Sequence, residues 1–540
     1  MFTRMNSRAV QSAFALSFAA ALAVSALQLS GLDRLRREKQ LMQAEVLKNA
    51  PPEYAILTTA LGGFRGLLAD FLWLRAIRLE KESRHFELVQ LYDWIGKLQP
   101  RIPEIWLFNS HNLAYNLSIS MPDRDDRWLW IQRGVDLILE QGIRYNPDSH
   151  ELYLQLAWLY LHKIGGRADD YHWHYKTNIA LKMQRTLGTS TCDIKALADP
   201  ALRVDWETFL KKNPDAAGLS FRVEAMDIDL AKTYGDFLWK EAGLDEEQLA
   251  FMQEAEAQGT LPKVRNYFAA RLLREDWKLE PARMAQLSKK YGEIDWRLSD
   301  SVAFYWASKA IELAKTSVEK ESTNRIFYFS FMNLFRKGRL FLEPQGDDYV
   351  YLTQPELRFA KPLFDHFEEA VKDAPLARHA QQGFLEELVY TLYSFNQTKE
   401  ARDYHLILKK KFPEGKYAGS LDEFILRHIG TDIAHANFDQ TLVTISGFVR
   451  QAYWWLAVGE DDRFEGFMHQ ARQVRKFYMI SRANQETQRL ALPRLEQIQR
   501  KSLEQAFHAQ DEKMRFPILL RQRLEERIGE IPPQPAQKSP

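Results

Sequence analysis

Cysteine is almost absent from this chain of 540 residues, since Cys192 is its only one. A disulfide within the chain is therefore impossible, and so is a zinc site built from several thiolates. An excess of charge of either sign is absent too, because 73 basic residues balance 72 acidic ones. Proteins that bind nucleic acid normally carry a basic face or a high isoelectric point, so this balance argues against that class. The scattered serines and histidines form no recognisable nucleophile motif.

The composition that remains is that of a folded, helix-rich protein. Hydrophobic residues make up 46% of the chain and charged residues 27%, which excludes wholesale disorder. The length suits several domains or one long array of repeats. The 14 tryptophans, 21 tyrosines and 32 phenylalanines provide the large rings that usually fill contacts between packed helices.

The N-terminal region predicts attachment to a membrane. A basic start at residues 1–8 precedes the nearly uncharged stretch 9–32. About 20 apolar residues span a bilayer, so we interpret residues 9–32 as an uncleaved transmembrane helix. A cleaved secretory signal has the same order of basic residues, apolar core and small residues, and a buried soluble helix is a third interpretation. Residues 33–54 form a charged stalk.

Two signals disagree about the side of the membrane on which the body lies. Arg34, Arg36, Arg37 and Lys39 outnumber the arginines before the stretch, and counting positive residues would keep the body in the cytoplasm. The signal-like order of the N-terminal residues favours export. We predict a single-pass membrane protein with its body on the extracytoplasmic side.

Residues 61–100 predict a hairpin of two amphipathic helices, which Pro100 ends. Their apolar residues follow a helical period: Leu67, Leu68, Phe71, Leu72, Leu74 and Leu79, then Phe86, Val89, Tyr92, Ile95 and Leu98. A lone hairpin cannot cover both apolar faces and needs further hairpins stacked against it. Residues 55–74 are apolar enough to resemble a second membrane span, but Arg65 and Asp70 would each be costly in the middle of a bilayer, so we expect a buried first helix of the array.

Similar helical patterns recur along the chain. They cover residues 104–118, 125–145, 150–164, 170–187, 226–243, 246–258, 263–277, 301–316, 326–336, 359–372, 421–429, 438–458 and 463–479. Residues 193–218 predict a connecting region, and residues 349–352 predict a brief strand. Residues 485–528 predict a helical segment that is rich in charged residues and is interrupted by Pro493 and Pro517.

Three segments share a series of large and small residues at helical packing positions. They are Leu72, Ala76, Tyr92, Ile95 and Pro100 in the first; Pro147, Tyr153, Leu156, Ala157 and Tyr160 in the second; and Leu385, Leu388, Leu392, Ala401, Leu408 and Pro413 in the third. This series resembles the tetratricopeptide repeat, a helix-turn-helix unit of roughly 34 residues. Val389 stands where the family prefers glycine and Asn109 where it prefers leucine, so the array is divergent.

The resemblance implies an all-α fold, a right-handed solenoid of helical hairpins, to which we add one N-terminal transmembrane helix. We divide the body into residues 55–190 (a first repeat array), 191–355 (an irregular helical middle), 356–480 (a second repeat array), 481–528 (charged helices) and 529–540 (a proline-rich, disordered tail).

The resemblance also implies a binding groove, because one face of each first helix in the family lines a concave surface that holds an extended peptide or a partner helix. Carried over position by position, that face includes Glu104, His111, Asn112 and Tyr115 in one unit, and Glu151, Trp158 and His162 in the next. Asparagine and aromatic side chains suit a peptide, whose backbone needs hydrogen bonds and whose side chains need pockets. The alternative is that these residues simply pack against a neighbouring repeat.

Two other patterns are weak. His172 and His174 lie two residues apart and so on different faces of a helix, which does not suit a shared metal. Gly62, Gly63 and Gly66 precede a helix but lack the Gly-Lys-Ser/Thr ending of a phosphate-binding loop. We expect no metal, no cofactor and no catalysis; an enzyme would need converging ionisable groups between residues 192 and 355.

The sequence thus predicts a non-enzymatic scaffold or adaptor, confined to a membrane by its N-terminal helix, that binds a partner protein and no nucleic acid. The alternative is a structural subunit of a larger membrane or envelope assembly, which predicts aromatic patches on the outer surface.

Overall fold

The computed structural model describes residues 64–82, 84–187, 193–225, 246–345, 348–373, 377–413, 415–433, 438–481, 492–509 and 515–529. In these ranges the chain is helical apart from one pair of strands, which confirms the predicted all-α class. No helix in these ranges is long and apolar enough to cross a membrane. The predicted membrane segment 9–32, the stalk 33–54 and the predicted helix 226–243 lie outside the described residues.

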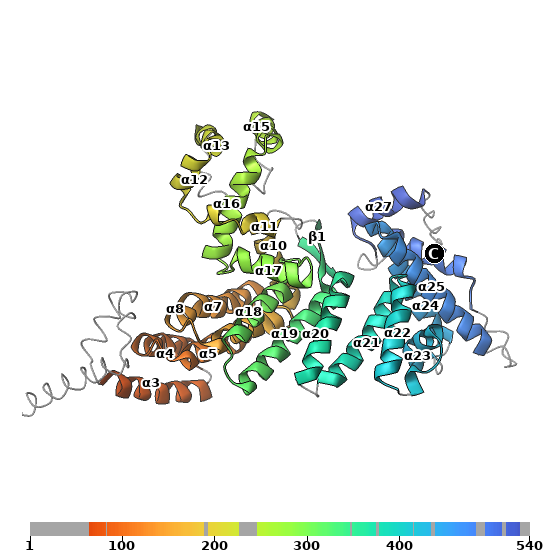
Figure 1. Ribbon diagram of the computed structural model, residues 1–540, viewed down its shortest axis with the longest axis horizontal. Coiled ribbons are helices and arrows are strands. Elements are labelled where there is room, and N and C mark those ends of the chain that lie inside the picture. Colours follow the sequence, from red (N-terminus) through yellow and green to blue (C-terminus); the bar gives the residue numbers. More distant parts are fainter. Residues whose placement is uncertain are drawn as a thin grey trace, which may run out of the picture. The chain divides into compact units, whose positions relative to one another are not determined.

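The chain divides into two compact units, residues 1–152 and 153–540. The first contains α3 (Phe64–Lys81), α4 (His85–Leu98), α5 (Pro103–His111), η2 (Asn112–Leu117), α6 (Ser118–Ser120), α7 (Arg124–Asp136), η3 (Leu137–Gly142), α8 (Ile143–Tyr145) and the first residues of α9 (His150–Trp158). Figure 1 shows the described helices with these labels.

The second unit continues from α9 with the following elements. They are η4 (Leu159–Ile164), α10 (His172–Leu187), α11 (Ile194–Leu197), η5 (Pro200–Leu202), α12 (Trp206–Lys212), α13 (Pro214–Ala225), α15 (Glu246–Ala257), α16 (Thr260–Glu275), α17 (Pro281–Tyr291), α18 (Ser299–Leu313), α19 (Ser317–Lys337), β1 (Arg339–Gln345), β2 (Asp348–Gln354), η6 (Leu357–Phe359), α20 (Ala360–Asp373), α21 (Ala377–Ser394), α22 (Thr398–Lys411), η7 (Gly415–Tyr417), α23 (Leu421–Ile433), α24 (Phe438–Val458), α25 (Asp461–Ser481), α26 (Leu495–His508) and α27 (Ile518–Ile528).

Helices α3 and α4 form the predicted first hairpin, but α3 buries only one of its two apolar stripes. The small and large residues Ala69, Leu72, Ala76 and Leu79 are buried in the cluster that α4 completes. Their spacing of three and four residues places them on one helix face. Phe71 and Leu74, which the sequence reading placed in a buried helix, lie on another face and are exposed. That expectation was wrong for this face because nothing in the described part of the chain covers it.

Among the described residues, three helices contain a π-helical segment of six residues: η2, η3 and η4. Each closes with an amide that donates to the carbonyl five residues earlier, from Ser118 to Leu113, from Ile143 to Ile138 and from Gly165 to Tyr160. An α-helix would bond four residues back, so each segment adds one residue to a turn.

In the second unit, helices α18 to α23 pack one on the next in chain order (Figure 1). The residues that the repeat resemblance assigned to packing are buried here, including Leu385, Leu388 and Leu392 in α21 and Ala401 and Leu408 in α22. Small side chains such as Ala401 let two helices approach, and the leucines fill the space between them. Burial of these residues is what any close helix pair requires, so it does not distinguish one repeat family from another.

The predicted strand at residues 349–352 is confirmed as part of a β-hairpin. Strand β1 pairs antiparallel with β2, and Phe341 lies opposite Leu352. Strand β2 packs against α10 and α19. Tyr351 is buried there, beside the ring of Trp173 at a centroid distance of 6.2 Å.

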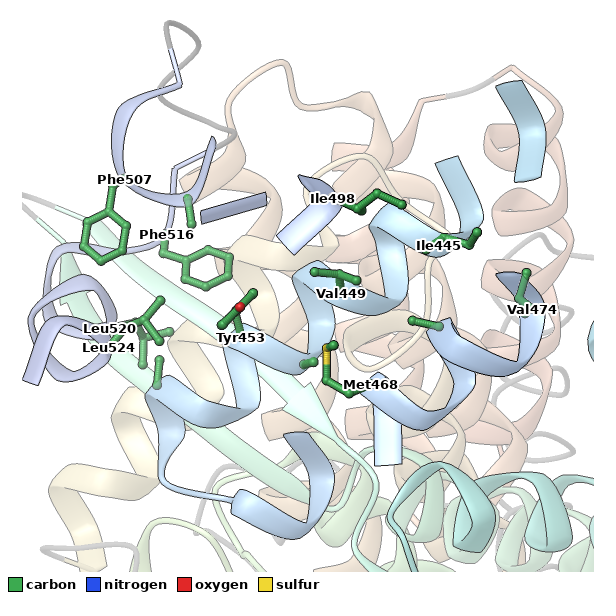
Figure 2. Close-up of a cluster of buried hydrophobic side chains, with 14 of the residues drawn as sticks. Ile445, Val449, Tyr453, Met468, Val474, Ile498, Phe507, Phe516, Leu520 and Leu524 are labelled. Carbon is green, nitrogen blue, oxygen red and sulfur yellow. The ribbon is translucent and has the colours of Figure 1, made fainter. Parts of the chain in front are cut away.

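The C-terminal helices α24 to α27 share one hydrophobic cluster, which Figure 2 shows in close-up. The prediction that prolines interrupt this region is confirmed, because α26 begins two residues after Pro493 and Pro517 immediately precedes α27. A proline has no amide to donate and so starts helices more readily than it continues them. The side chains that meet here include Ile445, Val449, Tyr453, Met468, Val474, Ile498, Phe507, Phe516, Leu520 and Leu524.

The connecting region predicted at residues 193–218 is wrong, because α11, η5, α12 and the start of α13 lie within it. Local capping explains these short helices. The Asp205 carboxylate accepts from the amide of Thr208 at 2.9 Å, and Pro214 occupies the first position of α13. Helix α17 was also missed, and Pro281 stands at its start. In both α13 and α17 the proline opens a helix, where its missing amide costs nothing.

Candidate functional site

The predicted groove residues of the first unit lie at different depths. Glu104 is exposed in the first turn of α5. His111 ends α5 and stacks on the ring of Tyr115, with 4.5 Å between centroids and 20° between planes. Asn112 is 1% exposed, and its Oδ1 accepts from the side chain of Asn116 at 3.1 Å. The accessible part of the predicted face is therefore the pair His111–Tyr115 with Glu104, and Asn112 lies beneath it.

The remaining predicted residues lie along α9 and η4. Glu151 is exposed and accepts from the hydroxyl of Ser149 at 2.7 Å. Trp158 and His162 are half-buried and stack almost parallel, with 4.4 Å between centroids and 8° between planes. Stacked rings at this distance form one flat surface that is apolar on its faces and carries hydrogen-bonding groups at its edge.

The two ring pairs share a local geometry. In each, the first ring belongs to the last residue before a π-helical segment and the second lies inside it: His111 with Tyr115 in η2, and Trp158 with His162 in η4. Residues four apart lie on one side of a helix. Turns of this rare kind frequently occur at functional sites, so the pairs are a candidate surface for a ligand.

Both imidazoles in these pairs are biased toward the neutral form. Desolvation by the surrounding groups lowers the pKa of His111, and the Glu80 carboxylate opposes it in part. Desolvation also lowers the pKa of His162, and the charge of Lys163 adds to the effect. A neutral imidazole has one nitrogen that donates and one that accepts, so each pair can bond either group of a peptide backbone at pH 7.

Sequence reasoning missed a second feature, a cluster of charged groups around the turn Gly165–Gly166. Lys163 and Asp169 form an ion pair at 2.9 Å whose side chains are each 1% exposed. Lys176 donates to the carbonyl of Gly166 at 2.9 Å. The turn needs glycine at residue 166, because a Cβ there would overlap the carbonyl oxygen of His162.

Residues from α18 and α19 complete this charged cluster. Lys337 donates to the carbonyl of Gly165 at 3.3 Å and pairs with Asp300 at 2.9 Å. The side-chain amide of Asn333 donates to Asp300 at 2.7 Å. Carbonyl groups at the end of a helix have no partner within it, so the two lysines satisfy acceptors that η4 leaves open.

The electrostatics of Lys176 follow from this crowding. Burial, and then the charge of Lys337, lower the pKa of Lys176 to about 8, while Asp300 opposes the shift. Its Nζ also lies 3.1 Å from Nδ1 of His172. An amine of this kind exchanges protons near neutral pH and can act as a base where substrate reaches it. Lys176 is only 7% exposed and is directed at a backbone carbonyl, so the arrangement suits a structural clamp.

No family model, curated protein or solved structure matches this chain. The resemblance to the tetratricopeptide repeat therefore remains a prediction based on the residues quoted above.

The two histidines weighed as metal ligands have separate partners. His172 lies beside Lys176, whereas His174 Nε2 lies 3.0 Å from the side-chain amide of Asn178. This agrees with the reasoning that residues two apart point to different sides of a helix.

A signal for the charged cluster is present in the sequence. Lys163 interrupts the apolar run 159–164 just before two glycines, and a charge inside an apolar run suggests a buried pair. Its partner Asp169 is only six residues away, but the other members Asp300 and Lys337 could not be named in advance, because they are far away along the chain.

Proposed function

We propose that this chain is a helical-repeat scaffold, tethered to a membrane by residues 9–32, that binds an extended peptide or a helix of a partner protein. The observation that carries the proposal is the repeated stack of an aromatic ring on an imidazole, His111–Tyr115 and Trp158–His162, at the entry of a π-helical turn.

The chemistry of these pairs favours a peptide. Flat stacked rings offer contact area at little cost in side-chain entropy, and the neutral imidazoles can donate to a carbonyl or accept from an amide. Interfaces between proteins commonly concentrate their binding free energy on a few such aromatic residues. The exposed carboxylates of Glu104 and Glu151 stand near the start of the same helices and would favour basic residues in the partner.

The succession of helices supports a solenoid. From α18 to α23 each helix packs on the next in chain order, as stacked hairpins do. The uncharged stretch 9–32 and the signal-like residues before it support a single-pass protein with an extracytoplasmic body. A reporter that is active only outside the cytoplasm can be fused to the C-terminal end. Its activity tests directly on which side of the membrane the body lies. Activity confined to the cytoplasm would reverse the orientation.

Peptide binding can be tested on the full chain in detergent. Peptides are selected from a random library displayed on phage, synthesised with a fluorophore, and titrated by fluorescence anisotropy. We expect each double variant, His111→Ala with Tyr115→Ala or Trp158→Ala with His162→Ala, to weaken binding of a selected peptide about 5- to 30-fold for each anchor that it uses.

The matched control is Phe221→Ala, which removes a ring that is 75% exposed on α13. We expect it to leave the affinity unchanged. Affinities that are the same for the wild-type chain and both double variants would contradict the proposal, as would a library that yields no peptide with saturable binding.

A further inference from the structure

The outer face of α3 carries a row of uncovered apolar side chains. Phe71, Leu74 and Ile77 follow one another at intervals of three residues and are 63%, 68% and 39% exposed. The opposite stripe of the same helix is buried against α4. Soluble surfaces rarely leave such rows uncovered, so this face is a candidate for contact with something else.

Basic residues border this row. Arg75 and Arg78 line a groove of about 480 Å³ together with Phe71, Leu74, Leu79, Glu82 and Arg84, and Glu82 is paired with Arg84 at 3.4 Å. Among the described residues, no carboxylate lies within ion-pair distance of either arginine. Arg84, at the end of the groove, is already paired with Glu87. Two arginines thus remain available beside an apolar row.

The position of α3 in the chain indicates what covers this face. It is the first described helix, and residues 33–63 separate it from the uncharged stretch 9–32. A helix with one apolar face and a basic border lies in the plane of the headgroups, where its apolar side chains enter the acyl boundary and its arginines meet lipid phosphates.

A second copy of the chain would fit this face less well. Two-fold pairing of the same patch would place Arg75 and Arg78 close to the same arginines of the other copy, and like charges repel. An anionic lipid surface is complementary to both properties of the patch.

We propose that α3 lies along the surface of an anionic bilayer, with Phe71, Leu74 and Ile77 in the acyl boundary and Arg75 and Arg78 at the lipid phosphates. The inference rests on the membrane tether of the proposed function for its proximity to lipid. It makes α3 a second point of attachment, which would fix the direction in which the body leaves the membrane.

The test uses the full chain with a single label. Cys192→Ser removes the native cysteine, and Leu74→Cys introduces one that carries a nitroxide spin label. The protein is reconstituted into vesicles of phosphatidylcholine with about 30% phosphatidylglycerol and into vesicles of phosphatidylcholine alone. Electron paramagnetic resonance then measures collisions of the label with oxygen, which enriches in the bilayer, and with a water-soluble nickel complex.

In anionic vesicles we expect the label at residue 74 to collide several-fold less with nickel and more with oxygen than a control label at Val443→Cys. Val443 is 71% exposed on α24, outside the proposed surface. Adding Arg75→Gln and Arg78→Gln should lower the ratio of lipid-bound to free label about 30-fold, because each basic residue near an anionic surface contributes about fivefold.

Three other outcomes would overturn the inference and identify the reason. In the first, the label at residue 74 stays in water, but the chain still floats with the vesicles after a high-salt wash. This result would support the membrane tether and contradict the α3 contact. In the second, the label collides equally rarely with the nickel complex in detergent and in both vesicle types, which would show that another part of the chain covers this face. Magnetic broadening between labels would identify a second copy. By contrast, flotation that depends on anionic lipid and is lost in high salt would support the α3 contact and refute the tether.

Discussion

Replacing Asp169 with asparagine should be among the most destabilising single changes in the chain. The substitution leaves the buried ammonium of Lys163 without its counter-charge while changing the shape of the side chain very little. The oxygen of the introduced amide could still accept from the backbone amide of Tyr171, the bond that Asp169 makes at 3.0 Å. The variant therefore loses the negative charge beside Lys163 and one of the two acceptor oxygens of Asp169, and the bond from Tyr171 can remain.

The expected magnitude follows from the burial of the pair. Removing one partner of a fully buried ion pair typically costs about 3–5 kcal/mol, because the remaining charge is buried and has lost the opposite charge that offset its desolvation. The matched control is Glu275→Gln, which breaks the pair with Arg271 at the same distance of 2.9 Å but with side chains 57% and 42% exposed. Exposed pairs of this kind are worth about 0.5 kcal/mol or less.

Urea denaturation followed by circular dichroism measures the overall change, and hydrogen exchange of the amides in α10 reports the local one. The double variant Lys163→Met with Asp169→Asn should recover most of the loss, because it removes the stranded charge and keeps the acceptor for Tyr171. A loss below about 1 kcal/mol for Asp169→Asn would refute the reasoning. So would a double variant that is no more stable than the single one.

Three further outcomes are expected from the same structure. The pKa of Lys176 is about 8 in the folded chain against an ordinary 10.5, so the unfolded chain holds the proton more tightly and the free energy of unfolding should rise with pH between about 8 and 10.5. At about 1.36 kcal/mol for each pH unit, the free energy of unfolding should rise by about 3 kcal/mol in total, with no rise below pH 8. The rise should be absent in Lys176→Met when both proteins are unfolded in urea across this pH range. Parallel pH profiles of the two proteins would contradict the prediction. Gly466→Ala in α25 should destabilise the chain by about 2 kcal/mol, because the new Cβ would overlap the carbonyl oxygen of Ser394 and lie 2.8 Å from the amide of Asn396. Gly447→Ala in α24 meets nothing within 4 Å and should stabilise by up to about 1 kcal/mol, so thermal unfolding of the two variants must shift in opposite directions.

Helices with a strong apolar period could be predicted closely from the sequence. The stretch 150–164 is continuous helix between the same residues, and α24 begins and ends where its apolar pattern does. In both places the period runs over many residues and turn signals flank it, such as Gly165 and Gly459. Short helices without a long period were missed, and α13 and α17 both open on a proline that resembles a break.

Burial within a correctly predicted helix was harder to foresee. Phe71 and Leu72 adjoin in α3 and are equally apolar, yet one is exposed and the other buried. Which apolar stripe of a helix becomes buried depends on the helices that pack against it, and these cannot be identified from the sequence of that helix alone. Asn112 is likewise buried although the neighbouring His111 is exposed.

The candidate site was foreseeable in part. The ring pairs His111–Tyr115 and Trp158–His162 could be placed on one helix side from their spacing of four residues, and the structure brings both into contact. The charged cluster around the turn Gly165–Gly166 could not be predicted from the sequence, because its residues come from η4, α10, α18 and α19. Only tertiary folding joins residues separated by 172 positions, as Lys337 and Gly165 are.

The three π-helical segments also affect how this chain should be compared with others. Each contains one residue more than an α-helix needs to cover the same contacts. An alignment that assumes a constant helical period will therefore slip by one position at residues 112–117, 137–142 and 159–164. A single-residue gap at each of these places restores the correspondence of the packing positions that follow. Repeats that look unrelated when their lengths are compared can then prove equivalent.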